Sequence, residues 1–360
     1  MTSNPDAGLE AESDLEDAVK FGKSRLRWRE YLVSFVVTAA VCAFIYARMD
    51  VSAFTDGLGK ANYLLLIPAT VIISFAWFLR AVRWHVLLRP FHDMPMWEGW
   101  RVLMVSSAIG AVVPARAGEL WRAHAMGRHT GLSRSTVLGT IVVERLIDGS
   151  VLVVLAMISI VAIGPSSSIA ILIIAMGGAF VLGTIFFMVM THSPRLQDWV
   201  TGLLLKLAPA KLKPAVADKM SLFMHGVSSL RSNSVLLSAS GLTVVIYLLD
   251  AFTYWMMGRS FGLHVSADAY LLVVVVSNLA VAIPISIGGI GPYEFFVQQA
   301  LVLQDAHSEL ALALALFMHV LTLLVPALWG VLGMWKGAAP VRLSRTTPIE
   351  TPLVRKSTST

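Results

Sequence analysis

Three charged residues lie inside the otherwise apolar stretch 136–163, where their types and spacing could support chemistry. Glu144 and Asp148 are four residues apart and would share one face of a helix, and Arg145 lies three residues before Asp148. A charge at mid-membrane costs about 2.5–3.5 kcal/mol on insertion scales, so all three are expected to face a cavity or another segment. They form either the polar wall of a translocation path or a self-neutralising ion pair that fixes helix packing.

A second group of candidate residues follows Pro114 in the sequence PARAGELWR. Gly118 allows close backbone approach, and the helix after it would present free N–H groups to an anion. Arg116 and Arg122 could hold a phosphate in forked geometry, with Glu119 between them in the chain. Alternatively, these arginines mark the cytoplasmic interface of a membrane.

A third group lies in the glycine-rich segment PISIGGIGPYE. Gly288, Gly289 and Gly291 permit tight turns, and Pro292 suits the first turn of the next helix. Glu294 falls in that turn, where the helix dipole favours a carboxylate, so it is either a helix cap or a site residue. The glycines do not form a nucleotide-binding loop, because the G-x-x-x-x-G-K-[ST] pattern is absent.

Single polar residues in other apolar stretches are weaker candidates. Asp250 could be a proton or cation site, or the partner of an arginine. His319 is expected to be a hydrogen-bond donor in packing rather than a proton relay. Arg80, Arg83 and Trp84 are interpreted mainly as anchors at the membrane interface.

The composition indicates which solvent surrounds these residues. Of 360 residues, 56% are apolar and only 14% are charged, against about 25% charged in soluble domains. The mean hydropathy is +0.73, so the chain is predicted to be an integral membrane protein. The net charge of +6 comes from basic residues in short loops, which indicates topology and contact with lipid headgroups rather than nucleic acid. Cys42 is the single cysteine, and no metal site or cofactor is expected.

An all-α polytopic fold with six full spans and two re-entrant helical hairpins is predicted. A bilayer core of about 30 Å needs about 20 apolar helical residues. The stretches long enough are 31–48, 62–80, 136–163, 168–190, 235–258 and 309–334. Shorter apolar runs at 100–113 and 270–283 break at a proline, which predicts hairpins near 96–130 and 268–305. The alternative is two ordinary short spans.

The remaining segments are predicted from charge and composition. Residues 1–30 are polar, acidic and then basic, which is not the order of a cleaved signal peptide. The transmembrane domain is expected at 31–336, with a cytoplasmic amphipathic segment at 191–233 and a disordered tail at 337–360. The basic loops place both termini in the cytoplasm.

An internal repeat is predicted from matches at an offset of 170 residues. By this topology the two copies enter the membrane from opposite sides, as in transporters whose broken helices carry the binding site. The matched pairs are Ser107 and Ser277, Pro114 and Pro284, Gly118 and Gly288, Arg80 and Asp250, and Trp84 and Tyr254.

Four motifs in order, RAVRW, PARAGELWR, ERLID and PISIGGIGPYE, resemble the lysylphosphatidylglycerol synthase transmembrane family, also described as flippase-like, over about 31–336. Its best-known members, the multiple peptide resistance factors, join such a membrane domain to a soluble aminoacyl transferase. This chain ends soon after its last span, so the resemblance implies the lipid-translocating part without the synthase. The implied functional residues are Arg116, Gly118, Glu119, Arg122, Glu144, Arg145, Asp148, Gly288, Gly289, Gly291 and Glu294.

The expected function is therefore that of a lipid transporter of the bacterial inner membrane, and not of an enzyme. Its cargo would be a lipid with an anionic or modified headgroup, or a prenyl or hopanoid lipid. Membrane lipids are the expected partners, with a second copy or envelope-biogenesis proteins as further candidates. The alternatives are a membrane-embedded enzyme acting on lipid-linked substrates, a small-solute or ion transporter, and a scaffold of an envelope complex.

Overall fold

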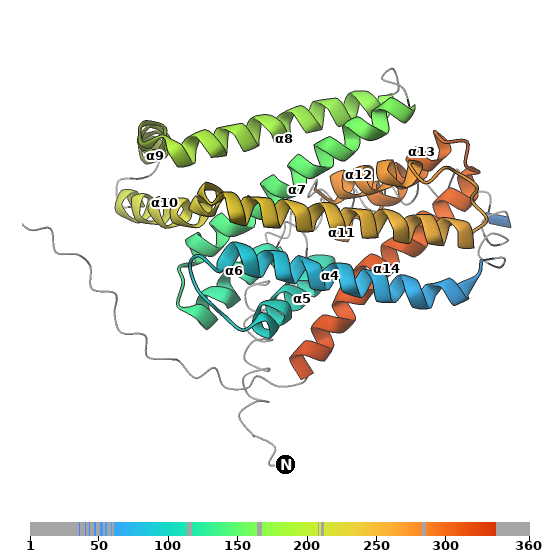
Figure 1. Cartoon of the computed structure of the whole chain (residues 1–360), viewed down its shortest axis with the longest axis horizontal. Helices are drawn as coiled ribbons and strands as arrows, with labels where there is room; N and C mark the ends of the chain where they lie inside the picture. The colour runs from blue at the N-terminus through green and yellow to red at the C-terminus, as the bar shows by residue number, and fades with distance from the viewer. Residues whose placement is uncertain are drawn as a thin grey trace, which may run out of the picture.

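The computed structural model of the chain describes residues 61–113, 117–163, 168–207, 209, 212–282 and 286–335, with isolated positions between 36 and 59. Within that part every regular element is a helix and no strand occurs, which confirms the predicted all-α class (Figure 1). The predicted segment 1–30, most of the predicted span 31–48 and the predicted tail 337–360 lie outside the described residues.

The helices keep the order expected from the apolar stretches and their breaks. A short 3-10 turn at Tyr63–Leu65 leads into the first long helix, and further 3-10 turns lie at Ser228–Arg231 (η3) and Ile287–Gly289 (η4). The α-helices are α4 (Leu66–Leu88), α5 (Met96–Val112), α6 (Ala117–Thr130), α7 (Arg134–Ile163), α8 (Ser168–His192), α9 (Pro194–Leu207), α10 (Lys213–Val227), α11 (Asn233–Ser260), α12 (Ala269–Ala282), α13 (Pro292–Val302) and α14 (Ser308–Trp335).

Three helical stretches in the described part are long and apolar enough to cross a membrane: Tyr63–Leu88, Asn233–Ser260 and Ser308–Gly333. The pair Gly177–His192 and Pro194–Leu207, bent by 108°, adds a fourth if it is counted as one span. Large apolar side chains such as Leu64, Ile67 and Leu237 are exposed on these helices, which is the surface that lipid covers. A multi-pass membrane protein is thus supported, while the count of six spans stays a prediction.

Two pairs of short helices occupy the positions of the predicted hairpins. α5 packs against α6, and α12 packs against α13. A Cβ placed on Gly118 would overlap the backbone oxygen of Ser106, so the backbones of α5 and α6 are in direct contact at this glycine. Pro114 and Pro284, the predicted break points, lie outside the described residues.

The helices α4 and α11 lie side by side and run in opposite directions (Figure 1). The backbone N–H of Asn62, just before α4, donates to the carbonyl of Ser260 at the end of α11 over 3.2 Å. Further along, Arg80 bonds Asp250, and Arg83 then bonds Thr243. Residue numbers therefore rise along one helix while they fall along the other.

Helix packing follows the same scheme in both halves of the described chain. In the first half, α6 packs on α7 and α5 crosses to α14; in the second, α13 packs on α14 and α12 crosses to α7. α5 ends at Val112 and α12 ends at Ala282, which are 170 positions apart. The helices α8, α9 and α10 lie between the two halves in sequence.

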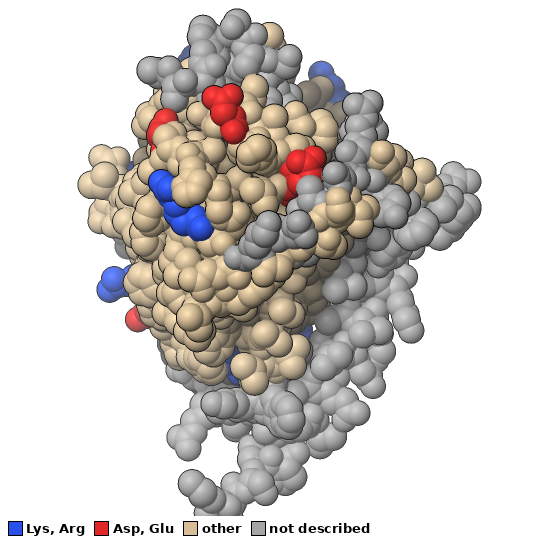
Figure 2. All heavy atoms as spheres, turned by 90° about the vertical axis from the view of Figure 1, so that its right-hand side faces the viewer, with Lys and Arg blue, Asp and Glu red and all other residues tan. Residues whose placement is uncertain are grey.

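The balance of charged side chains in the loops and helix ends differs between the two ends of the molecule. Figure 2 shows the end at which α4 begins and α11 ends, where charged side chains are sparse and of both signs. The described charged residues there are Arg259, Asp268, Asp305 and Glu309. The opposite end has more basic than acidic residues: its basic residues are Arg89, Arg128, Arg134, Arg195, Lys206, Lys213, Lys219 and Arg231, and its acidic residues include Asp93, Glu98, Asp198 and Asp218.

Candidate functional site

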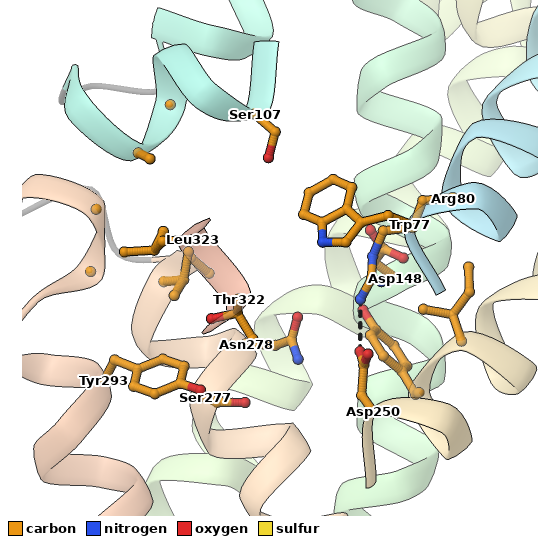
Figure 3. Close-up of a pocket in the computed structure, with 18 of the residues that line it drawn as sticks. Trp77, Arg80, Ser107, Asp148, Asp250, Ser277, Asn278, Tyr293, Thr322 and Leu323 are labelled. Atoms are coloured by element: carbon orange, nitrogen blue, oxygen red, sulfur yellow. Dashed lines mark hydrogen bonds and ion pairs between the residues drawn. The ribbon is translucent and has the colours of Figure 1, made fainter. Parts of the chain in front are cut away.

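A cavity of about 470 Å³ lies where the two helix pairs meet α4, α7, α11 and α14. Figure 3 shows Ser107 of α5 facing it from one side and Ser277 of α12 from another, with Arg80 and Asp250 on the wall opposite Tyr293. The predicted repeat had matched the two serines, and both line the cavity. The tips of the two helix pairs also meet, because a Cβ on Gly288 would lie 2.9 Å from the carbonyl oxygen of Ala111.

Arg83 is the centre of the charged wall. Its guanidinium is buried, contacts Asp148, and donates to Glu144 over 2.8 Å and to Thr243 over 2.7 Å. Glu144 and Asp148 therefore share a helix face, as their spacing predicted. The prediction that Arg83 is an interface anchor is wrong, because the side chain is 97% enclosed and holds α4, α7 and α11 together.

Arg122 forms a second buried contact to the same carboxylate. It donates to Glu144 over 2.7 Å, and its guanidinium carbon lies 4.6 Å from the centre of the Trp84 ring. Both Arg122 and Trp84 are buried, so neither is an interface residue and that interpretation is wrong for both. The opposite charge and the aromatic face stabilise this arginine away from water.

Arg145 is the most accessible member of the charged wall. It lies 3.2 Å from Glu144, 3.3 Å from Asp148 and 3.5 Å from Glu119. Its side chain keeps 42% of its surface exposed although it lies well inside the 30-residue helix α7. Arg145 lines the cavity, which gives its exposed guanidinium a space bounded by other polar side chains.

Arg80 and Asp250 form a separate pair across the α4–α11 contact. Their charged atoms are 2.7 Å apart, and each side chain is one-fifth exposed. Of the two interpretations left open for Asp250, the structure shows the partner of an arginine. Both residues line the cavity, so the pair contributes a donor and an acceptor to its wall (Figure 3).

Positive and negative charges in this wall are equal in number. An anion therefore gains no excess positive charge from these side chains, and would have to displace a carboxylate from an arginine. The cations are Arg80, Arg83, Arg122 and Arg145, and the anions are Glu119, Glu144, Asp148 and Asp250. Arg116, the other predicted phosphate ligand, lies outside the described residues.

The glycine-rich segment forms the other wall. Gly288 and Gly289 line the cavity with φ angles of 61° and 85°, which are accessible to glycine at little cost. Gly291, with φ of 95°, precedes α13, and its N–H donates to Glu294 over 2.6 Å. The capping interpretation of Glu294 is therefore correct, and its second oxygen contacts His319. Gly118 packs between helices rather than on the cavity surface.

Sequence reasoning underestimated Arg83 and His319, both of which line the cavity. A signal for Arg83 was present, because it lies three residues after Arg80, whose match at the 170-residue offset is acidic. Among the described residues, no group of three or more His, Cys, Asp or Glu side chains could hold a metal ion.

Apolar helices around a cavity with a charged wall define a multi-pass membrane protein with an internal site. Residues 31–330 match the family described as the lysylphosphatidylglycerol synthase TM region, and the chain belongs to that family. The resemblance expected from the four motifs is thereby confirmed.

The chain is also similar to two curated proteins. The chain is 24% identical over 361 residues to glycosyltransferase AglD of Haloferax volcanii, covering 89% of this chain and 55% of that protein. It is 22% identical over 252 residues to a UPF0104 membrane protein of Methanothermobacter thermautotrophicus, covering 66% of this chain and 74% of the relative. The chain thus spans about half the length of the AglD relative. No solved structure matches it.

Proposed function

We propose that the protein moves a lipid between the leaflets of the bacterial inner membrane without changing it chemically. The observation that carries this proposal is the cavity of about 470 Å³ lined by charged side chains inside a bundle with an apolar exterior. The lipid headgroup would occupy the cavity while its acyl or prenyl chains remain in the bilayer. Membership in the lysylphosphatidylglycerol synthase TM family supports a lipid as the cargo.

The depth of the site follows from the proposed inverted repeat. The antiparallel contact of α4 with α11 and the matching helix packing in the two halves support a two-fold axis in the membrane plane. Arg80 and Asp250 are counterparts at the 170-residue offset, and they contact each other. A residue that touches its own counterpart lies on the axis, so this ion pair would mark the middle of the bilayer.

Access from both sides follows from the two helix pairs. As re-entrant hairpins added to six full spans, they would enter the membrane from opposite faces and meet at the cavity, as Gly288 and Ala111 do. Movement of one hairpin at a time would expose the cavity to one leaflet and then to the other. The basic end of the molecule would face the cytoplasm, and the basic loops would place the two termini on the cytoplasmic side as well.

Arg145 is the proposed contact for the lipid phosphate, because it is the most exposed cation of the charged wall; the phosphate would displace one of its carboxylate partners. The neutral cavity also suits a headgroup that carries both charges or several hydroxyl groups. Such a headgroup could bond Arg145 and Glu119 together, since the two side chains are adjacent and 42% and 30% exposed.

The test is lipid translocation in proteoliposomes. Purified protein would be reconstituted with fluorescent lipids that differ in headgroup, and outer-leaflet quenching would be followed over time. Arg145→Ala is expected to slow headgroup-selective movement at least about tenfold, as for loss of one charge-assisted contact. Arg195→Ala, on an exposed helix face, is the matched control and should move lipid at the parent rate.

Other outcomes would favour other functions. Equal movement in the parent and Arg145→Ala proteins would contradict the site assignment. A lipid that emerges chemically altered would favour a membrane-embedded enzyme, the possibility raised by the name of the AglD relative. Solute-dependent protection from proteolysis without lipid movement would favour a small-solute transporter.

A further inference from the structure

The buried residue His319 of α14 touches two groups that both accept hydrogen bonds. Its Nδ1 lies 2.6 Å from a carboxylate oxygen of Glu294, and its Nε2 lies 3.0 Å from the carbonyl oxygen of Gly288. Both side chains are about 4% exposed. Glu294 belongs to α13 and Gly288 to the preceding turn η4, so His319 holds α13 and the turn before it against α14.

These contacts require one proton more than a neutral histidine beside an ionised carboxylate can supply. A neutral imidazole has a single N–H, and its other nitrogen is an acceptor. With Glu294 ionised, one contact would then bring two acceptors together. The arrangement is satisfied only if the imidazole is doubly protonated, or if Glu294 holds a proton and donates it to Nδ1. Either form contains the same extra proton.

The neighbouring aromatic ring agrees with a charged imidazole. Tyr293 stacks on His319 with ring centres 3.9 Å apart and an angle of 17° between the planes. The face of an aromatic ring is negative and attracts a cation above it. The Tyr293 hydroxyl in turn contacts the hydroxyl of Tyr254 from α11.

The corresponding connection in the first half of the chain cannot titrate in the same range. There, α6 is joined to α7 by Arg122 and Glu144, 2.7 Å apart. Arginine stays charged at all physiological pH values, whereas histidine is the side chain whose charge ordinarily changes between about pH 5 and 8. The contact that holds the helix pair therefore contains a permanently charged arginine in the first half and a protonatable histidine in the second.

We infer that Glu294 and His319 form a proton-binding site that holds α13 and the turn η4 against α14. The first helix pair is instead held by the ion pair of Arg122 and Glu144, which stays charged. Loss of the proton leaves two acceptors facing each other, so the tip at Gly288 separates from α14 and the cavity opens on that side. The role of this opening in transport rests on the proposed function, which it extends by naming the proton as the coupling ion.

Other charged groups on the elements around His319 already have partners or lie elsewhere. On α4 and α11, the charged residues that line the cavity are Arg80 and Asp250, which pair with each other, and Arg83, which pairs with Glu144 and Asp148. α5 places Arg101 beside Gly333, about four turns along α14 from His319. The described titratable neighbours of the site are therefore Glu294 and the tyrosine hydroxyls of Tyr293 and Tyr254.

The test measures how fast N-ethylmaleimide labels a thiol at the tip, in nanodiscs at about pH 5.5 and 8, a range that spans histidine titration. Cys42 is replaced by Ser, and Ser286→Cys supplies the thiol, since Ser286 lines the cavity and its buried hydroxyl has no hydrogen-bond partner. Ser266→Cys, at an exposed position before α12 that does not line the cavity, gives the reference rate at each pH. Labelling at position 286 relative to position 266 should rise about tenfold or more at the higher pH.

Two variants separate the proton from other causes of pH dependence. Glu294→Gln keeps every contact without the extra proton, because its amide oxygen can accept from Gly291 and its N–H can donate to Nδ1. It should label slowly at both pH values. His319→Gln cannot carry the charge and should label fast at both.

A relative rate that changes less than twofold with pH in the parent protein would overturn the inference. So would a Glu294→Gln protein, monodisperse on gel filtration, that keeps the parent pH dependence. The labelling assay requires no lipid movement, so a failed transport assay with a positive labelling result would reject the proposed function alone.

Discussion

Replacement of Arg83 by Met tests the charged wall most directly. Methionine keeps an apolar side chain of similar length but leaves Asp148 with Arg145 alone. Breaking a buried ion pair by removing one partner costs about 3–5 kcal/mol. Because Glu144 keeps Arg122 and Arg145, a loss near the lower limit, about 3 kcal/mol, is expected.

Charge balance predicts which second substitution restores the stability of Arg83→Met. The single substitution leaves the wall with one uncompensated negative charge. Adding Asp148→Asn removes that charge, so the double variant should be more stable than Arg83→Met by about 1–3 kcal/mol. A plain loss of packing would not be recovered by a change at position 148.

Reversible unfolding in mixed SDS micelles, followed by tryptophan fluorescence, measures these free energies. The ten tryptophans provide the signal. Arg195→Met, on an exposed face of α9, is the control and should change the free energy of unfolding by less than about 0.5 kcal/mol. The reasoning is refuted if Arg83→Met is as mild as the control, or if the double variant loses the sum of the single losses.

Three further predictions concern helix contacts and the central ion pair. Gly118→Ala should destabilise the first helix pair by about 1–3 kcal/mol, because its Cβ would overlap the backbone of α5. Gly110→Ala has open space and serves as the control, and the unfolding midpoints of the two variants in SDS are compared. Gly288→Ala adds backbone strain at a φ of 61° and should lower stability by about 1 kcal/mol or more in the same assay. Arg80→Asp and Asp250→Arg should each impair stability and lipid movement, while the two together restore much of both; a double variant no better than the singles would refute the pairing.

The class of fold was predictable because it depends on quantities summed over many residues. Apolar stretches of sufficient length, and their breaks near positions 114 and 284, placed most of the described helices. Glu294 as a helix cap followed from local rules, since the helix itself fixes the backbone N–H groups that donate to a carboxylate in its first turn.

Partners between distant helices could not be read in the same way. Arg83 and Trp84 are next to Arg80 and have the composition of an interface, but only tertiary packing shows that α4 turns them inward. His319 lies 25 residues from Glu294, and no local pattern links the two. The spacing of Glu144, Arg145 and Asp148 predicted a shared cluster, while the arginines that complete it come from α4 and α6.

The contact between Arg80 and Asp250 also bears on how the two halves of the chain arose. Under the proposed repeat, each residue of the pair occupies the other's position in the opposite half. In a dimer of two identical half-length chains, this position would meet its own copy, so an arginine would face an arginine or an aspartate an aspartate. Opposite charges can stand there only after duplication has given the two halves separate coding sequences that mutate independently. Under the proposed repeat the ion pair is therefore younger than the duplication, and a split into identical halves cannot reproduce it.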